Sequence, residues 1–121
     1  MDEWSDPEVT DQVATFYSAL GESDADAFDA AVEKLAETGP TLGRPIVGEI
    51  NLRDYPKAQQ VKHLKELRPL GTSIRVLFTF GPNRVPVLLY AGDKAGQWSR
   101  WYPAAVKEAG ELLAVYLEEI S

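Results

Sequence analysis

Two neighbouring strand-like segments constrain the fold of this chain most strongly. Residues 73–80 alternate between apolar and other side chains, as a strand with one buried side does. Residues 85–92 are apolar on both sides, which is typical of a strand in the middle of a sheet. The sequence Gly-Pro-Asn-Arg at 81–84 predicts a hairpin connection between them. One side of the first strand then carries Ile74, Val76, Phe78 and Phe80, and the other side carries Ser73, Arg75, Leu77 and Thr79.

Two helices are expected ahead of this hairpin. Asp6 predicts the N-cap of a first helix that stops at Gly21, with apolar residues at helical spacing between them. Ser23 predicts the cap of a second helix, which ends at Gly39. Both helices are rich in acidic residues, so their outer faces are expected to be negatively charged.

A further strand and a last helix complete the expected elements. Residues 63–68 predict a strand, whereas residues 40–58 resemble a loop. Whether residues 47–52 form a short strand within this loop is left undecided by the sequence. The final helix begins between residues 99 and 104, with Pro103 in its first turn. The order of elements predicts an α+β fold: two N-terminal helices and one C-terminal helix packed on a small twisted antiparallel sheet of three to four strands. With 121 residues, 45% of them hydrophobic, we expect a single domain over residues 1–121.

Composition excludes several classes of protein. The chain has no cysteine, which rules out disulfides, thiolate metal sites and cysteine nucleophiles, and His63 is its only histidine. Motifs of phosphate loops, dinucleotide sites and zinc proteases are absent from the sequence. There is no apolar run long enough to span a membrane, and the first residues are acidic, unlike an export signal. We therefore expect a cytoplasmic protein with no membrane partner, no metal and no cofactor.

Charge is divided unevenly along the chain. The net charge is −7, but residues 1–43 hold eleven acidic residues and one lysine, and residues 108–121 hold four glutamates. Residues 44–107 hold eleven basic residues and four acidic ones, so the middle of the chain is strongly basic. This division suggests a surface that faces a polyanion, although chance clustering of charge on solvated faces is an alternative.

The cations of the expected strands are the first candidates for chemistry. Lys65 and Arg68 lie on the strand expected at 63–68, Arg75 lies on the strand expected at 73–80, and Lys94 follows the strand expected at 85–92. Alternation directs Arg75 away from the core formed by its apolar neighbours, where a guanidinium can bind a phosphate. A salt bridge from Arg75 to Glu66 across the sheet is an equally good interpretation.

Further candidates lie outside these strands. Aromatic rings beside Lys94 can stack on exposed bases, although core packing is the commoner role of such rings. His63 can serve as an acid or base, or simply lie on the surface. The remaining candidates for RNA binding are Arg44, Arg84, Trp98, Arg100, Trp101 and Tyr102.

Several segments together resemble a known family. They are GPTLGRP at 39–45, HLKELRP at 63–69, IRVLF at 74–78, LLYAGDKAG at 88–96 and WSRWY at 98–102. In this order and spacing they resemble the RelE/ParE superfamily of bacterial toxins, in particular its HigB-like, phage-derived branch. The resemblance covers roughly residues 30–118 and implies a RelE-like toxin domain.

The resemblance implies the toxin of a type II toxin–antitoxin system. Such toxins are held inactive by a cognate antitoxin, usually a helix-turn-helix protein, and many cut mRNA, often on the ribosome, without a metal. Metal-free cleavage lets the ribose 2′-OH attack the adjacent phosphate, and fixed cations stabilise the extra charge that develops. Arg68, Arg75 and Lys94 would hold the phosphate, and Lys65, or His63, would assist proton transfer.

Two other functions remain open at this point. Members of the ParE side of the superfamily bind DNA gyrase without cutting RNA, and an inactive member would bind only its antitoxin. Cleavage requires the strand cations to converge on one face, whereas a binding function allows them to diverge.

Overall fold

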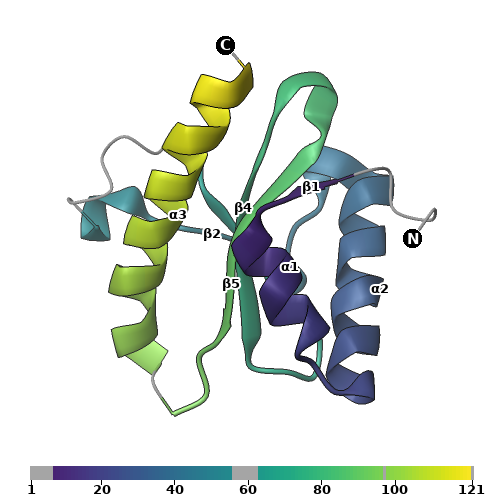
Figure 1. Cartoon of the computed structure of the whole chain (residues 1–121). Helices are drawn as coiled ribbons and strands as arrows, with labels where there is room; N and C mark the ends of the chain where they lie inside the picture. Colours follow the sequence, from purple (N-terminus) through teal and green to yellow (C-terminus); the bar gives the residue numbers. More distant parts are fainter. Residues whose placement is uncertain (1–6, 56–62, 97, 121) are drawn as a thin grey trace.

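The computed structural model describes residues 7–55, 63–96 and 98–120. In this part of the chain a five-stranded sheet lies between two helical layers, which confirms the α+β fold (Figure 1). The strands are β1 (Glu8–Val9), β2 (Val47–Glu49), β3 (Lys65–Leu67), β4 (Ile74–Phe80) and β5 (Pro86–Asp93). The helices are α1 (Asp11–Ser18), α2 (Glu22–Thr38) and α3 (Trp98–Ile120), with 3₁₀ turns η1 (Gly39–Thr41), η2 (Leu52–Asp54) and η4 (Pro82–Arg84).

The sheet has one more strand than expected and is not purely antiparallel. Its order is β1-β5-β4-β3-β2, so β5 is an inner strand, as its apolar character predicts. The pairs β2–β3, β3–β4 and β4–β5 are antiparallel, whereas β1 runs parallel to β5. The predicted hairpin is formed by β4 and β5 around η4. The strand that the sequence left undecided within 47–52 is present as the short β2.

The first helix begins later than the sequence suggests. Asp6 lies outside the described residues, and Glu8 and Val9 pair with β5 instead of forming a helical turn. Thr10 is the N-cap of α1, because its side chain accepts a hydrogen bond from the backbone N–H of Val13. The same hydroxyl donates to the carbonyl of Leu89 at 2.8 Å, so Thr10 joins strand and helix. Pairing with a strand 79 residues away overrides the local helix-start signal.

The other helix starts also differ slightly. Gly21 is the N-cap of α2, which therefore begins at Glu22, before the predicted cap at Ser23. Its end is as predicted, since Gly39 takes a positive φ of 76° at the C-cap. α3 begins at Trp98, so Pro103 lies in its second turn and not in the first.

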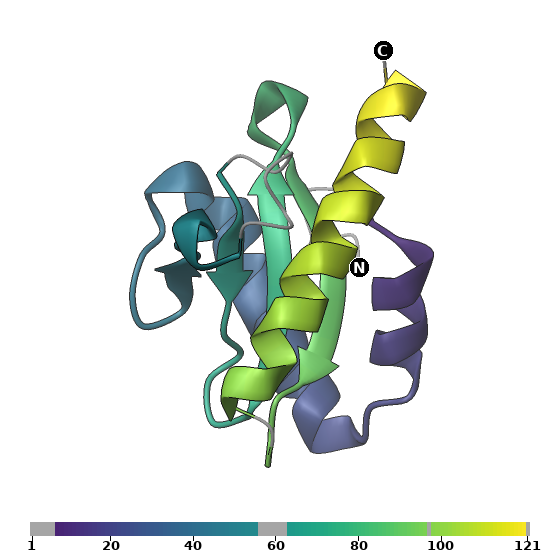
Figure 2. The same cartoon turned by 90° about the vertical axis from the view of Figure 1, so that its left-hand side faces the viewer.

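Alternation along the strands builds two cores. Ile74, Val76 and Phe78 of β4 are buried against α1 and α2, in a core that includes Phe28 and Leu35. On the other face, side chains of β4 and β5, together with Leu64, pack against α3. Figure 2 shows α3 crossing in front of the sheet. This second core contains Leu64, Leu77, Val87, Leu89, Trp101, Ala105, Val106, Ala109 and Leu113.

A bulge in β5 adjusts which side chains face α3. Leu77 pairs with Tyr90, but the next residue, Phe78, pairs with Leu88, so Leu89 has no partner on β4. As a result both Leu89 and Tyr90 contribute to the core beneath α3. The bulge lies between the hydrophobic end of this face and the end that carries the cations.

Candidate functional site: a partly buried cationic cluster

Strand register gathers three of the predicted cations on the α3 side of the sheet. Glu66 pairs with Leu77, which belongs to the core beneath α3, so Glu66 faces the same way. Arg75 precedes Leu77 by two residues and therefore shares its face. Arg68 and Lys94 complete the group, and we call Glu66, Arg68, Arg75 and Lys94 the cationic cluster.

Each member of the cationic cluster is held by a specific contact. Arg68 Nε donates to Glu66 Oε1 at 2.8 Å. Arg75 Nη1 donates to the carbonyls of Ile74 and Thr72, at 2.7 and 3.3 Å. Lys94 Nζ donates to the Tyr102 hydroxyl at 3.3 Å and lies 5.3 Å from the centre of that ring. Arg75 therefore forms no ion pair with Glu66 among the described contacts; the carboxylate bonds to Arg68 instead.

The cationic cluster lies partly inside the protein. Glu66 is 1% exposed and Lys94 is 8% exposed, while Arg68 and Arg75 are half-buried. Glu66 Oε2 and Arg75 Nε are buried and have no partner at good hydrogen-bond geometry among the described residues, although the Tyr102 hydroxyl lies near both side chains. Because an unsatisfied buried polar atom costs free energy, these two atoms mark a place that favours a polar ligand.

Burial and like charge shift the ionisation of two groups in this region. Burial lowers the pKa of Lys94 below its ordinary value, the positive charges of Arg75 and Arg68 lower it further, and Glu66 opposes them. Burial and the nearby Glu66 carboxylate raise the pKa of Tyr102 far above its ordinary value. Tyr102 therefore stays protonated, and Lys94 gives up its proton more readily than an exposed lysine.

Two glycines provide the room for these side chains. A Cβ on Gly48, the partner of Glu66 on β2, would lie 2.5 Å from Arg68 Nη2. A Cβ on Gly92 would lie 2.6 Å from Trp101 Nε1. The role of Gly48 was not predicted from the sequence, although a glycine inside a strand is a known sign of close approach.

Several candidate residues lie away from the cationic cluster. Lys65 faces the opposite side of the sheet, where its Nζ lies 5.9 Å from the Phe80 ring centre and 3.7 Å from Glu49 Oε2. Period-two alternation explains this position, because side chains an odd number of positions apart along a strand, such as Lys65 and Arg68, point to opposite faces of the sheet. Arg84 lies in η4, at the far end of the β4–β5 hairpin from Arg75. Arg44 precedes β2 and, like Arg84, Arg100 and His63, is exposed.

The aromatic candidates divide between core and surface. Trp101 is 8% exposed and belongs to the core beneath α3, where its ring lies edge-on to Tyr102 at 5.1 Å between centres. Tyr102 is half-buried and contacts Lys94. Trp98 begins α3, but its side chain lies outside the described part of the structure. Tyr102 is therefore the aromatic candidate that the structure brings to the cationic cluster.

A shallow pocket opens beside the cationic cluster. Its volume is about 240 Å³, and it lies where η2, β3 and α3 meet. Its lining residues are Glu49, Ile50, Asn51, Asp54, Tyr55, Glu66, Arg68 and Tyr102. We call it the η2 pocket.

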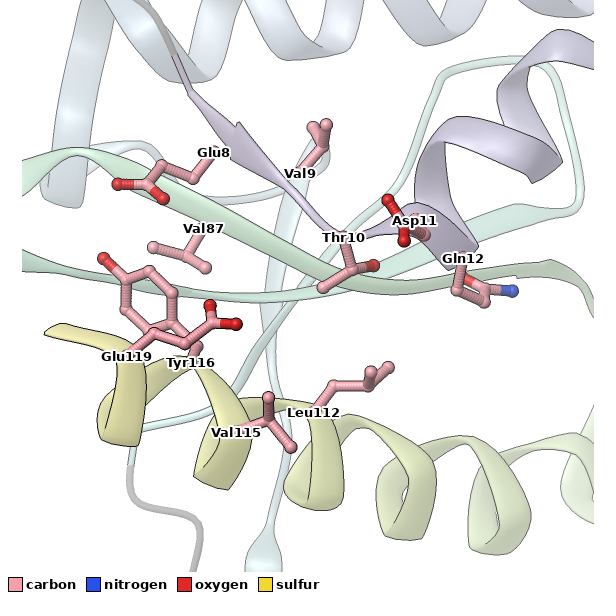
Figure 3. A pocket seen from close by; sticks show the side chains of 10 residues that line it. All are labelled: Glu8, Val9, Thr10, Asp11, Gln12, Val87, Leu112, Val115, Tyr116 and Glu119. Atoms are coloured by element: carbon pink, nitrogen blue, oxygen red, sulfur yellow. The ribbon is translucent and has the colours of Figure 1, made fainter.

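A second pocket, of about 290 Å³, has a different character. It lies between β1 and the C-terminal half of α3, where Leu112, Val115 and Tyr116 face β1 (Figure 3). Its charged residues are all acidic, namely Glu8, Asp11 and Glu119. Because these carboxylates repel a phosphate, the cationic cluster is the better candidate for binding a polyanion.

Within the described ranges, no three acidic or histidine side chains gather in a way that could hold a metal ion. None of the described helices is both long and apolar enough to cross a membrane.

The fold and the cluster define a small α+β protein whose sheet carries a partly buried group of cations. The sequence model of the family described as "Phage derived protein Gp49-like (DUF891)" matches residues 16–114, and the chain belongs to this family. It is 45% identical over 91 residues to the Mycobacterium tuberculosis protein named "Putative toxin HigB3", which covers 75% of each chain. It is 35% identical over 112 residues to "Putative toxin HigB2" of the same organism, covering 90% of this chain and 53% of that protein. No solved structure matches the chain significantly.

These comparisons confirm the HigB-like, phage-derived resemblance of the sequence. Both relatives carry the name "Putative toxin", and residues 16–114, which the family model matches, include all four members of the cationic cluster. The family of this chain is therefore established.

Proposed function

We propose that this protein is the toxin of a type II toxin–antitoxin system and acts as a metal-independent endoribonuclease on mRNA in the cytoplasm. The observation that carries the proposal is the convergence of Arg68, Arg75 and Lys94 on one face of the sheet. Three positive charges against the single carboxylate of Glu66 leave this cluster cationic within an acidic protein. The names of the two HigB relatives support the assignment to a toxin.

The proposed reaction is attack of a ribose 2′-OH on the adjacent phosphate. The P–O bond to the 2′ oxygen forms, the P–O bond to the 5′ oxygen breaks, and the products are a cyclic phosphate and a 5′-hydroxyl. Negative charge increases on the phosphoryl oxygens in the transition state, where fixed guanidinium groups stabilise it. Arg68 and Arg75 are suited to this role, because hydrogen bonds to Glu66 and to backbone carbonyls hold their head groups in place.

Proton transfer is assigned to Lys94 in place of Lys65. A lysine assists proton transfer near neutral pH only if its pKa is lowered, and burial beside Arg75 lowers that of Lys94. Lys65 lies on the opposite face of the sheet, in contact with Glu49 and Phe80. In this proposal the uncharged amine of Lys94 accepts the 2′-OH proton, the resulting ammonium donates a proton to the departing 5′ oxygen, and the Tyr102 hydroxyl positions the lysine head group.

The test is incubation of the purified protein with RNA, with and without ribosomes and with a chelator in every reaction. We expect cleavage that persists in the chelator and falls at least about 100-fold in Lys94→Gln, the typical contribution of general acid–base catalysis. Lys107→Gln is the matched control, because Lys107 is exposed on α3 and pairs with Glu111. Growth inhibition without cleavage under any of these conditions would instead support a ParE-like toxin that binds gyrase.

The proposal includes a cognate antitoxin, expected to be a helix-turn-helix protein. An acidic segment of such a partner would complement the cationic cluster and speed association. Co-expression with a helix-turn-helix protein encoded next to the toxin gene should restore growth. A protein that binds this partner but inhibits growth in no condition would be an inactive member of the family.

A further inference from the structure

The η2 pocket is lined in part by residues that the phosphate-binding proposal does not use, among them Asn51, Asp54 and Tyr55. Arg68 stands at the border between this pocket and the cationic cluster, since it lines the pocket and bonds to Glu66. A phosphate held by Arg68 would therefore place part of the same nucleotide at the pocket. At about 240 Å³, the pocket is large enough for one planar base.

Of the three carboxylate residues that line the η2 pocket, Glu49 pairs with Lys65, and the other two, Glu66 and Asp54, make the pocket a hydrogen-bond acceptor. Glu66 is 1% exposed and lines the pocket, and its Oε2 has no partner at good hydrogen-bond geometry among the described residues. Asp54, in η2, is exposed and adds a second carboxylate. Ionised carboxylates only accept hydrogen bonds, so the occupant of this pocket has to present N–H or O–H donors.

The other lining residues narrow the choice of occupant. The side-chain oxygen of Asn51 accepts a hydrogen bond from the backbone N–H of Arg53 at 3.1 Å, so the NH₂ group of Asn51 is the part left to donate. Tyr55 and Tyr102 are half-buried and provide flat apolar surface at the same pocket. Aromatic rings beside polar groups are the usual surroundings of an unstacked RNA base.

We infer that the η2 pocket binds a guanine base of the RNA. The Watson–Crick edge of guanine presents two adjacent donors, N1–H and N2–H₂, beside one acceptor, O6. Two adjacent donors suit a carboxylate, and O6 suits the NH₂ group of Asn51. Adenine and cytosine offer a single amino group beside a bare ring nitrogen, and uracil places two carbonyls toward the carboxylates.

This inference deepens the proposed function, on which it rests for its ligand class. A guanine in the η2 pocket would give the cleavage a sequence preference, because its neighbouring phosphate would lie at Arg68. Asp54 would be the specificity-determining residue, since it is exposed and its replacement leaves the buried Glu66–Arg68 pair intact.

The test is NMR titration of the ¹⁵N-labelled full chain with 5′-GMP, 5′-AMP, 5′-CMP and 5′-UMP. We expect GMP to shift the amide signals of Asn51, Asp54 and Tyr55, with a dissociation constant at least about tenfold lower than those of the other nucleotides. Asp54→Asn should remove this preference, while Asp11→Asn, in the pocket between β1 and α3, should keep it. Equal affinities for all four nucleotides, or a GMP preference that survives in Asp54→Asn, would overturn the inference.

Two further measurements test this inference separately from the proposed function: the base preference of RNA cleavage, and an NMR titration with argininamide. Cleavage of RNA without any guanine preference, together with equal nucleotide affinities, would leave the nuclease proposal standing and remove the base site. A guanine preference in binding that depends on Asp54, without cleavage of RNA, would support the base site and remove the nuclease. Shifts at Asn51 and Asp54 caused by argininamide but not by GMP would assign the pocket to a basic protein side chain and overturn the inference.

Discussion

Arg68 and Glu66, two residues apart on one side of the sheet, form a hydrogen bond of 2.8 Å between Nε and Oε1. The carboxylate is buried, and its position fixes the guanidinium above Gly48. Removing a charge from water is costly unless an opposite charge compensates it. Loss of either side chain would therefore leave the other as an uncompensated buried charge and destabilise the fold. The same carboxylate lowers the mutual repulsion of Arg68, Arg75 and Lys94, which allows three cations to gather at one place.

Charge reversal at Arg75 should abolish toxicity. Arg75→Glu places a third carboxylate beside Glu66 and Asp93 and removes a guanidinium from the proposed phosphate site. We expect loss of growth inhibition, with a native circular dichroism spectrum, because Arg75 is half-buried near the start of β4 and is not a core residue. Lys107→Glu, which changes the charge equally on the exposed face of α3, is the control. Full toxicity of Arg75→Glu would show that Arg75 has no part in the activity.

A methyl group on Gly48 should impair activity more than stability. In Gly48→Ala the new Cβ would meet Arg68 Nη2 at 2.5 Å and Cζ at 2.7 Å, so the guanidinium has to move. Because a side-chain end moves at little cost, we expect the free energy of unfolding to change by less than about 1 kcal/mol, while RNA cleavage falls at least about tenfold. Gly43→Ala is the control, since no atom lies within 4 Å of a Cβ there. Equal cleavage by the two variants would contradict the proposed role of Arg68.

Neutralising Glu66 should destabilise the fold. Glu66→Gln keeps the shape of the side chain but leaves Arg68, Arg75 and Lys94 without their buried countercharge. Removing one partner of a buried ion pair typically costs about 3–5 kcal/mol, and the partial exposure of Arg68 reduces this to about 2–3 kcal/mol. The measurement is urea unfolding at pH 7, with Glu111→Gln, from an exposed ion pair, as the control that should leave stability nearly unchanged. Similar stabilities of the two variants would mean that Glu66 compensates no buried charge.

Acid should weaken the link between β4 and β5 at Asp93. The Ser73 hydroxyl, followed by the Ala95 backbone N–H, holds the pKa of Asp93 below its ordinary value of 3.8. A folded-state pKa below the unfolded one stabilises the protein above about pH 3.8 and loses this effect as the pH falls through the lowered value. Ser73→Ala and Asp93→Asn should therefore both lower stability at pH 7 and differ less from the wild type at pH 2. Urea unfolding at the two pH values measures this, and a pH-independent difference would exclude the linkage.

Local patterns were sufficient for the central elements of the fold. Alternation in β4 correctly separates Ile74, Val76 and Phe78 from Leu77, because side-chain direction along a strand depends only on position. The apolar character of β5 correctly predicts an inner strand. The same alternation was enough to place Lys65 and Arg68 on opposite faces, a consequence that the sequence prediction of a common site overlooked.

Local patterns do not predict the pairing between segments that are distant in the sequence. β1 is two residues long, too short to show any periodicity, and its contact with β5 spans 79 residues. The bulge at Leu89 likewise depends on two strands at once, because it exists only as a mismatch between their registers. For the same reason the sequence does not predict the close approach of Gly48 and Arg68. The two residues are twenty positions apart and become neighbours only because β2 pairs with β3.

The sequence by itself determined the α+β class, the β4–β5 hairpin, the long last helix and the family, because each follows from local periodicity or from the order of short motifs. Only the tertiary structure decided which cations share a place and what surrounds them. In the structure Lys65 lies on the opposite face of the sheet and contacts Glu49. Glu66 is buried and bonds to Arg68, and Lys94 bonds to Tyr102. The physical reason is that burial and Coulomb interactions depend on distances in space between residues of β3, β5 and α3, and no spacing along the chain determines those distances.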